Sequence, residues 1–156
     1  MGTNTLTKPF DKKLYDQTDG KAKRKIKKYL RSKDHIIDSN TKEDYKCDVK
    51  SISGRGILTF SEVEIKLSWK GEWPTSWKDV RIPYRKKKLL DSIESDLTFY
   101  IFREDCKEMW VIPDHIIKEK GSVVEVSNRF VREGEQFYSI PVECIYKLTY
   151  RFNLLY

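Results

Sequence analysis

Three carboxylates and a lysine fall in two short segments of this chain. Glu62, Glu64 and Lys66 alternate with apolar residues along 61–69, and Asp48 lies on a strand-like segment before them. Side chains of a strand point alternately to its two faces, so the three charged residues of 61–69 share one face. Crowded carboxylates repel and desolvate one another, and such clusters commonly need a cation or a catalytic role. Mg²⁺ prefers oxygen ligands, so these residues predict a divalent-metal site.

The turn between the two segments decides which acids meet. The residues Ser53-Gly54-Arg55-Gly56 predict a turn that joins them as a hairpin. If the hairpin is centred on Arg55, Asp48 lies opposite Glu62 and diagonal to Glu64. If it is centred one residue later, Asp48 lies opposite Glu64. Both registers leave the three acids on one face, within reach of a shared ion.

Phosphodiester hydrolysis is the chemistry that these residue types suit. It needs an activated water, charge neutralisation on the phosphate and help for the leaving oxygen, and one or two Mg²⁺ ions can supply all three. We expect Asp48 and Glu64 to bind the metal, together with the backbone carbonyl of Ile65. Lys66 is expected to orient or activate the attacking water and to offset charge on the phosphorus.

At these residues the chain resembles the PD-(D/E)xK nuclease superfamily, which includes restriction enzymes and archaeal-type Holliday junction resolvases. Asp48 matches the first acid of the family, and Glu64-Ile65-Lys66 matches its Glu-x-Lys. The resemblance covers roughly residues 18–117. It implies an α/β fold whose mixed central sheet is flanked by helices, in the order αβββαβ. It also implies Mg²⁺- or Mn²⁺-dependent cleavage of DNA that leaves a 5′-phosphate, with homodimers common where duplex DNA is cut.

Two features depart from the pattern of that family. Cys47 precedes Asp48, where the family often has proline, and the first predicted helix has no glutamate in its body. Some members carry an additional metal ligand on that helix. Asp16 or Asp19 could supply such an acid here, and Glu62 is a further additional acid.

The same residues also have simpler interpretations. Glu62 could be a solvated carboxylate beside Lys46 or Lys50, and the other acids could form a ladder of surface salt bridges with Lys66. Two alternative functions follow. One is a catalytically inactive nucleic-acid-binding module of the same fold, and the other is an interaction or structural protein whose acid–lysine strand is only a solvated face.

Positive charge predominates, with 31 Lys and Arg against 24 Asp and Glu and a net charge of +7. An excess of cations favours a polyanionic partner, because each neutralised phosphate releases counterions. A helix is predicted from Thr18-Asp19, with an apolar stripe that includes Ala22, Ile26 and Leu30 and with basic residues at most other positions. The resemblance to DNA-cutting enzymes implies DNA, rather than RNA, as this partner. The expected contacts are Lys23, Lys27, Lys50, Arg55, Arg85, Lys86, Lys87 and Lys88.

The length of 156 residues suits a single nuclease-like domain. We expect a flexible segment at 1–17, a core at about 18–117 and further strands at 118–156. The three cysteines are scattered, which disfavours a disulfide framework or a zinc site and indicates a cytoplasmic protein. No apolar run approaches the roughly 18–20 residues of a membrane span, so a membrane is not an expected partner.

The remaining pattern predicts an α/β core with one continuous mixed sheet. A loop rich in Pro and Trp is expected at 70–83, and its tryptophans, with Trp69, are expected to pack in the core or cover the site. The other expected elements are a strand at 35–38, a strand at 45–52, a helix at 84–94, a hairpin of 97–103 with 109–112, a helical turn at 113–117, and strands at 123–126, 137–140 and 145–152.

Overall fold

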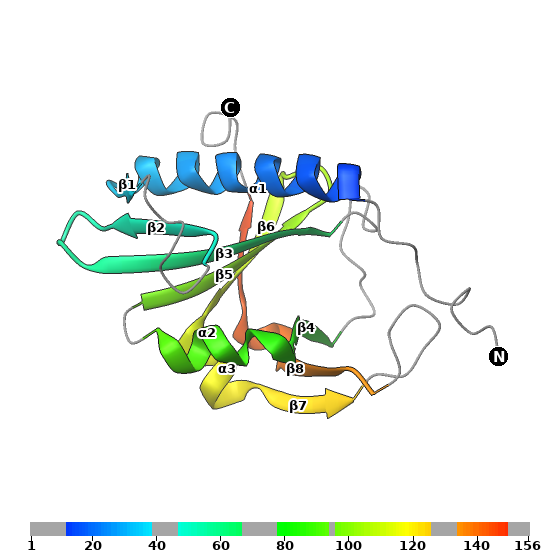
Figure 1. Ribbon diagram of the computed structural model, residues 1–156. Coiled ribbons are helices and arrows are strands. Elements are labelled where there is room, and N and C mark those ends of the chain that lie inside the picture. Colours follow the sequence, from blue (N-terminus) through cyan, green and yellow to red (C-terminus); the bar gives the residue numbers. More distant parts are fainter. Residues whose placement is uncertain (1–11, 39–46, 67–77, 94–95, 126–133, 150–156) are drawn as a thin grey trace.

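A long helix crosses one face of a mixed β-sheet, and shorter helices with a small second sheet lie on the other face (Figure 1). The computed structural model describes residues 12–38, 47–66, 78–93, 96–125 and 134–149, with side chains from residue 20 onward. In chain order the elements are α1 (Lys12–Ser32), β1 (Ile36–Asp38), β2 (Val49–Ile52), β3 (Leu58–Lys66), β4 (Asp79–Pro83), the 3₁₀ helix η3 (Tyr84–Lys86), α2 (Lys87–Ser92), β5 (Asp96–Arg103), β6 (Glu108–Pro113), α3 (Asp114–Lys120), β7 (Ser122–Glu125), β8 (Gln136–Pro141), the 3₁₀ helix η4 (Val142–Cys144) and β9 (Tyr146–Thr149).

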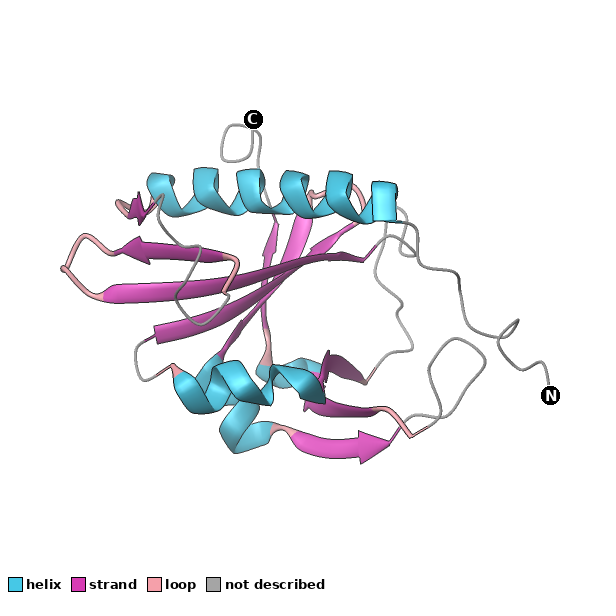
Figure 2. Cartoon of the chain, viewed as in Figure 1, coloured by secondary structure: helices cyan, strands magenta, loops and turns pink. Residues whose placement is uncertain are grey.

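The main sheet has six strands in the order β1-β2-β3-β5-β6-β9. β3 and β5 run parallel, and every other neighbouring pair in this sheet is antiparallel. The parallel pair requires a crossover, which runs through β4, η3 and α2 on the face opposite α1 (Figure 2). The described residues therefore form an α/β protein with a mixed central sheet flanked by three α-helices.

The expectation of one continuous sheet is wrong, because β4, β8 and β7 form a separate three-stranded sheet. Residues 79–83, predicted as loop, form β4 because Val80 and Ile82 alternate with polar residues and bury their side chains, at 1% and 2% exposure. The start of the loop, with Trp69, Trp73 and Trp77, lies outside the described residues.

Helix α1 is longer than predicted. It begins at Lys12, so Thr18 and Asp19 lie inside the helix rather than at its N-cap, and the part of the segment 1–17 from residue 12 onward is helical. The predicted apolar stripe is confirmed: Ala22, Ile26 and Leu30 are at most 2% exposed. These residues recur at helical spacing, so burying them holds the whole length of the helix against the sheet.

The two faces of β3 differ as the alternating pattern predicts. Val63 and Ile65 pack into the cluster beneath α1, which contains Ile26, Leu30, Phe102 and Met109. Phe60 points the other way, into the core beneath α2, α3 and β4. Glu62, Glu64 and Lys66 therefore share the face opposite α1. The side chains of 67–69 lie outside the described residues.

Most of the other predicted elements are present. The turn at 53–56 is confirmed, with Gly56 at a φ of 80°, a conformation that glycine adopts without strain. The strand predicted at 45–52 is described from residue 47 onward, and its regular pairing begins at Val49. The helix predicted at 84–94 is the short pair η3 and α2, and the hairpin of β5 with β6, α3 and the later strands lie near their expected positions.

Candidate functional site

Asp48 and Glu62 meet where the β2–β3 ladder ends. The last pair of the ladder is Val49 with Ser61, so the next residues, Asp48 and Glu62, face each other. This is the register of a hairpin centred on Arg55. The amide N–H of Asp48 donates to Glu62 Oε2 at 2.8 Å.

A reciprocal bond completes this arrangement. The amide N–H of Val63 donates to Asp48 Oδ2 at 2.9 Å. Each carboxylate thus accepts a backbone donor of the other strand at the position where the ladder stops. These two bonds hold the acids in a defined orientation.

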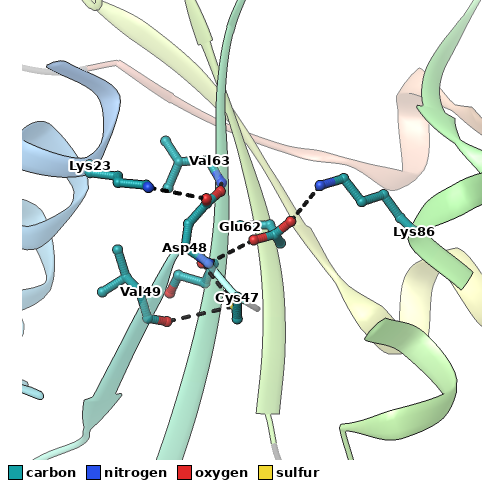
Figure 3. Close-up of polar contacts among 8 residues, drawn as sticks. Lys23, Cys47, Asp48, Val49, Glu62, Val63 and Lys86 are labelled. Atoms are coloured by element: carbon teal, nitrogen blue, oxygen red, sulfur yellow. Dashed lines mark hydrogen bonds and ion pairs between the residues drawn. The ribbon is translucent and has the colours of Figure 1, made fainter. Parts of the chain in front are cut away.

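Two lysines approach the acid pair, one from each layer of the structure (Figure 3). Lys86 Nζ, from η3, lies 2.6 Å from Glu62 Oε1. Lys23 Nζ, from α1, lies 3.7 Å from Asp48 Oδ1. Each of the four carboxylate oxygens therefore has a partner, which is a backbone N–H in two cases and an ammonium group in the other two.

The electrostatics of the pair favour an added positive charge. Glu62 is 4% exposed, and the Asp48 side chain is 22% exposed. Burial, followed by the negative charge of Glu62, raises the pKa of Asp48 from 3.8 to about 7, although the Val63 N–H and Lys23 act in the opposite direction. Burial alone lowers the pKa of Lys86, but the Glu62 carboxylate outweighs it and the net direction is upward. Asp48 is therefore only partly ionised near neutral pH, and an added cation would favour its charged form.

Cys47, the residue before Asp48, has a buried thiol. Its Sγ donates to the carbonyl oxygen of Ser61 at 3.2 Å and contacts that of Val49 at 3.8 Å. Burial and the nearby Glu62 charge raise its pKa to about 12. Cys47 is thus a neutral packing residue beside the acids, and not a nucleophile.

Glu64 and Lys66 form a separate ion pair further along β3. Lys66 Nζ lies 2.8 Å from Glu64 Oε1, and the Glu64 side chain is 48% exposed. Ile65 pairs with Phe102 in the β3–β5 ladder and packs beneath α1. Among the described residues, no three His, Cys, Asp or Glu side chains are close enough to hold a metal ion together. Of the three acids expected to converge, the structure brings together Asp48 and Glu62.

The interpretation of Glu62 as a solvated carboxylate beside Lys46 or Lys50 is wrong, because Glu62 is buried and bound to Lys86. Lys50 instead forms an ion pair with Asp38, at 3.7 Å. Lys46 and the side chains of Asp16 and Asp19 lie outside the described part of the structure.

The expected nucleic-acid contacts are divided among several surfaces. Lys23 and Lys86 reach the acid pair, and Lys27 lies partly exposed on α1. The rest are Lys50, paired with Asp38; Arg55, exposed in the 53–56 turn; Arg85, 3.9 Å from Glu135; Lys87, paired with Asp91; and Lys88, exposed on α2. No spacing in the sequence distinguishes Lys86 from its basic neighbours as the partner of Glu62, because that contact depends on the crossover between β3 and β5.

The donor set fits a hard divalent cation. Mg²⁺ is commonly held by one or two carboxylates and completes its shell with water and phosphate oxygens. Asp48 and Glu62 supply two carboxylates, and burial and the charge of Glu62, which raise the pKa of Asp48, both disfavour its ionised form, which a cation would stabilise.

Comparison with protein-family models, with characterised proteins and with solved structures found no match to this chain. No helix in the described residues is long and apolar enough to cross a membrane.

Proposed function

We propose that this chain is a metal-dependent endonuclease that hydrolyses phosphodiester bonds in DNA. The observation that carries the proposal is the acid pair Asp48–Glu62, held by reciprocal backbone bonds and flanked by Lys23 and Lys86. Carboxylates and ammonium groups at one point suit phosphate chemistry, because the acids can hold a cation and the lysines can bind the anionic substrate.

In this proposal Asp48 and Glu62 hold Mg²⁺ or Mn²⁺. The bound cation would neutralise charge on the phosphate and help a water molecule to lose its proton. Lys86 offsets the negative charge that develops on the scissile phosphate, and Lys23 exchanges its contact with Asp48 for a phosphate oxygen. Lys66, on the same face of β3 and paired with Glu64, contacts the substrate beyond the metal.

The order of the elements supports a restriction-endonuclease-like core. α1, β1, β2, β3, α2 and β5 occur in the αβββαβ order that the resemblance implies, with β4 and η3 inserted between β3 and α2. Helices lie on both faces of the sheet, and the strand that follows the second helix is parallel to β3. The acid pair lies where the β2–β3 ladder ends, and in this proposal Glu62, rather than Glu64 of the Glu-x-Lys match, takes the metal-binding role.

The test is cleavage of labelled duplex, single-stranded and four-way-junction DNA with Mg²⁺, Mn²⁺ or EDTA. Glu62→Gln should abolish cutting by the purified protein. Glu64→Gln is the matched control, because it makes the same change two residues along the same face, and it should retain most of the activity. If Glu64→Gln abolishes cutting and Glu62→Gln does not, the assignment of the acids is wrong. Absence of cutting by wild type under every metal condition refutes the nuclease proposal.

The alternative is a catalytically inactive nucleic-acid-binding module of the same fold. The observation that favours it is that all four oxygens of the acid pair already have partners within the protein. In that case the acids only fasten β2 to β3 and attract the lysines. Salt-sensitive DNA binding, together with no heat of Mg²⁺ binding in calorimetry and no cleavage, would support this alternative.

A further inference from the structure

The solvent face of α1 is a continuous line of positive charge. Lys21, Arg24, Lys28 and Arg31 are spaced by three and four residues, so they lie on one side of the helix, opposite the buried Ala22, Ile26 and Leu30. Lys21, Arg24 and Arg31 are exposed, and Lys28 is partly exposed. We call these four residues the basic face. At 1.5 Å per residue, it is about 15 Å long.

No acidic residue balances this charge in the part of α1 from Gly20 onward. From Gly20 to Lys33 the sequence contains no acidic residue. In the described part of the chain, Lys28 and Arg31 form no ion pair. A line of cations of this kind attracts a polyanion, because the charges repel one another until an anionic partner neutralises them.

The basic face is connected to the acid pair through one flank of α1. Lys23 and Lys27 are one turn apart, and they lie between the basic face and the sheet. Lys23 reaches Asp48, with its ammonium 3.7 Å from the carboxylate. A polyanion bound along the basic face can therefore extend to the acid pair, because Lys27 and Lys23 provide positive charge along the path between them.

The structure disfavours two other polyanionic partners. A basic amphipathic helix binds lipid by inserting its apolar face, but here that face is buried in the core, with Ile26 at 0% exposure. Single-stranded nucleic acid is usually held by aromatic side chains that stack on its bases. The one aromatic residue between Gly20 and Ser32 is Tyr29, which packs edge-on against Tyr100 with ring centroids 6.1 Å apart.

We propose that the basic face of α1 binds the phosphate backbone of duplex DNA and directs it to the acid pair. A stiff line of cations matches a polymer whose phosphates are themselves held at regular positions, and it needs no contact with the bases. The inference deepens the proposed function and rests on it only in treating the bound duplex as the substrate.

The test measures binding separately from cleavage. Protein carrying Glu62→Gln is titrated in EDTA against labelled duplex DNA, a single strand of the same length, and phosphatidylserine vesicles, over a range of salt concentrations. The α1 triple variant adds Arg24→Gln, Lys28→Gln and Arg31→Gln to this protein. The matched control removes three exposed lysines on the other side of the sheet, by Lys78→Gln, Lys118→Gln and Lys120→Gln, with the same loss of net charge.

Loss of three phosphate contacts should weaken duplex binding at least tenfold and reduce the slope of log K against log salt by about 2.7, since each duplex contact contributes about 0.9. The control should bind the duplex within about twofold of the parent, and binding to the single strand should be weaker throughout. Equal losses in the two triple variants, or tighter binding to the single strand or to vesicles, would overturn the inference.

Cleavage assays separate the two proposals. If wild type cuts duplex DNA and the same three α1 substitutions, made in wild type, leave cutting at subsaturating DNA unchanged, the basic face is not the contact surface, whereas the nuclease proposal stands. If the triple variant loses duplex binding while wild type cuts no substrate with any metal, the duplex-binding surface stands and the nuclease proposal fails.

Discussion

Replacing Asp48 with asparagine should stabilise the metal-free protein at alkaline pH. Burial and the charge of Glu62 raise the pKa of Asp48 from 3.8 to about 7. The folded protein therefore holds this proton more tightly than the unfolded chain does. The stabilising contribution is complete below about pH 4, is lost as the pH rises to about 7, and stays lost above that value. Asparagine remains neutral, and its carbonyl oxygen can still accept the Val63 N–H bond.

The magnitude follows from the two pKa values. At about 1.36 kcal/mol per pH unit, the interval between pKa values of 3.8 and about 7 means that ionising Asp48 lowers the free energy of unfolding by at most about 4 kcal/mol. The side chain is 22% exposed, so solvent screens part of this energy. Asparagine also loses the attraction of Lys23, which at 3.7 Å and partial exposure contributes up to about 1 kcal/mol. We therefore expect Asp48→Asn to be about 2 kcal/mol more stable than wild type at pH 8.

Urea denaturation in EDTA at pH 4, 6 and 8 measures this effect. The free energies of unfolding of wild type and Asp48→Asn should differ by no more than about 1 kcal/mol at pH 4. They should diverge as the pH rises, and the variant should have the larger free energy of unfolding. Glu64→Gln is the control, since its carboxylate is 48% exposed, and its effect should stay within about 0.5 kcal/mol at each pH. A variant less stable than wild type at pH 8 would refute the view that repulsion and burial strain this acid.

Further predictions concern the site and the scaffold. Lys86→Met should destabilise the protein by about 2 kcal/mol in urea denaturation, because it leaves the buried Glu62 carboxylate without its ammonium partner; an unchanged midpoint would mean that the pair contributes nothing. Saturating Mg²⁺ at pH 8 should raise the melting temperature of wild type but not of Asp48→Asn, and equal shifts would place the bound ion elsewhere. Ile26→Ala should cost about 3 kcal/mol, because this side chain is 0% exposed beneath α1; a loss below about 1 kcal/mol would show that the helix is loosely packed. Gly56→Ala should cost about 1 kcal/mol in the same assay, since φ is 80° there, and no loss would mean that the turn rearranges.

The elements that position the site follow closely from local sequence. The stripe of Ala22, Ile26 and Leu30 predicted the face of α1 that is buried. The alternation along β3 predicted that Val63 and Ile65 would lie on the face opposite Glu62. Such patterns are reliable because the periodicity of a helix or strand depends only on neighbouring residues.

The separate three-stranded sheet was not predicted, because its strands come from distant parts of the chain. β4 pairs with β8, and Val80 lies opposite Ile140. Local pattern identifies a residue that needs burial, but it does not identify the strand that covers it. The same limit applies to the start of α1, where the capping residues Thr18 and Asp19 are overridden by a helix that continues through them from Lys12.

The sequence alone was sufficient for the charged face of β3, the buried stripe of α1 and a turn at 53–56, since each depends on residues close together in the chain. It left two registers open for the acids, because moving the centre of the hairpin by one residue exchanges Glu62 for Glu64 as the partner of Asp48. The pairing of Val49 with Ser61 decides in favour of Glu62. Lys86 reaches that acid because the parallel strands β3 and β5 require a crossover, and the crossover carries η3 across the sheet to the acid pair.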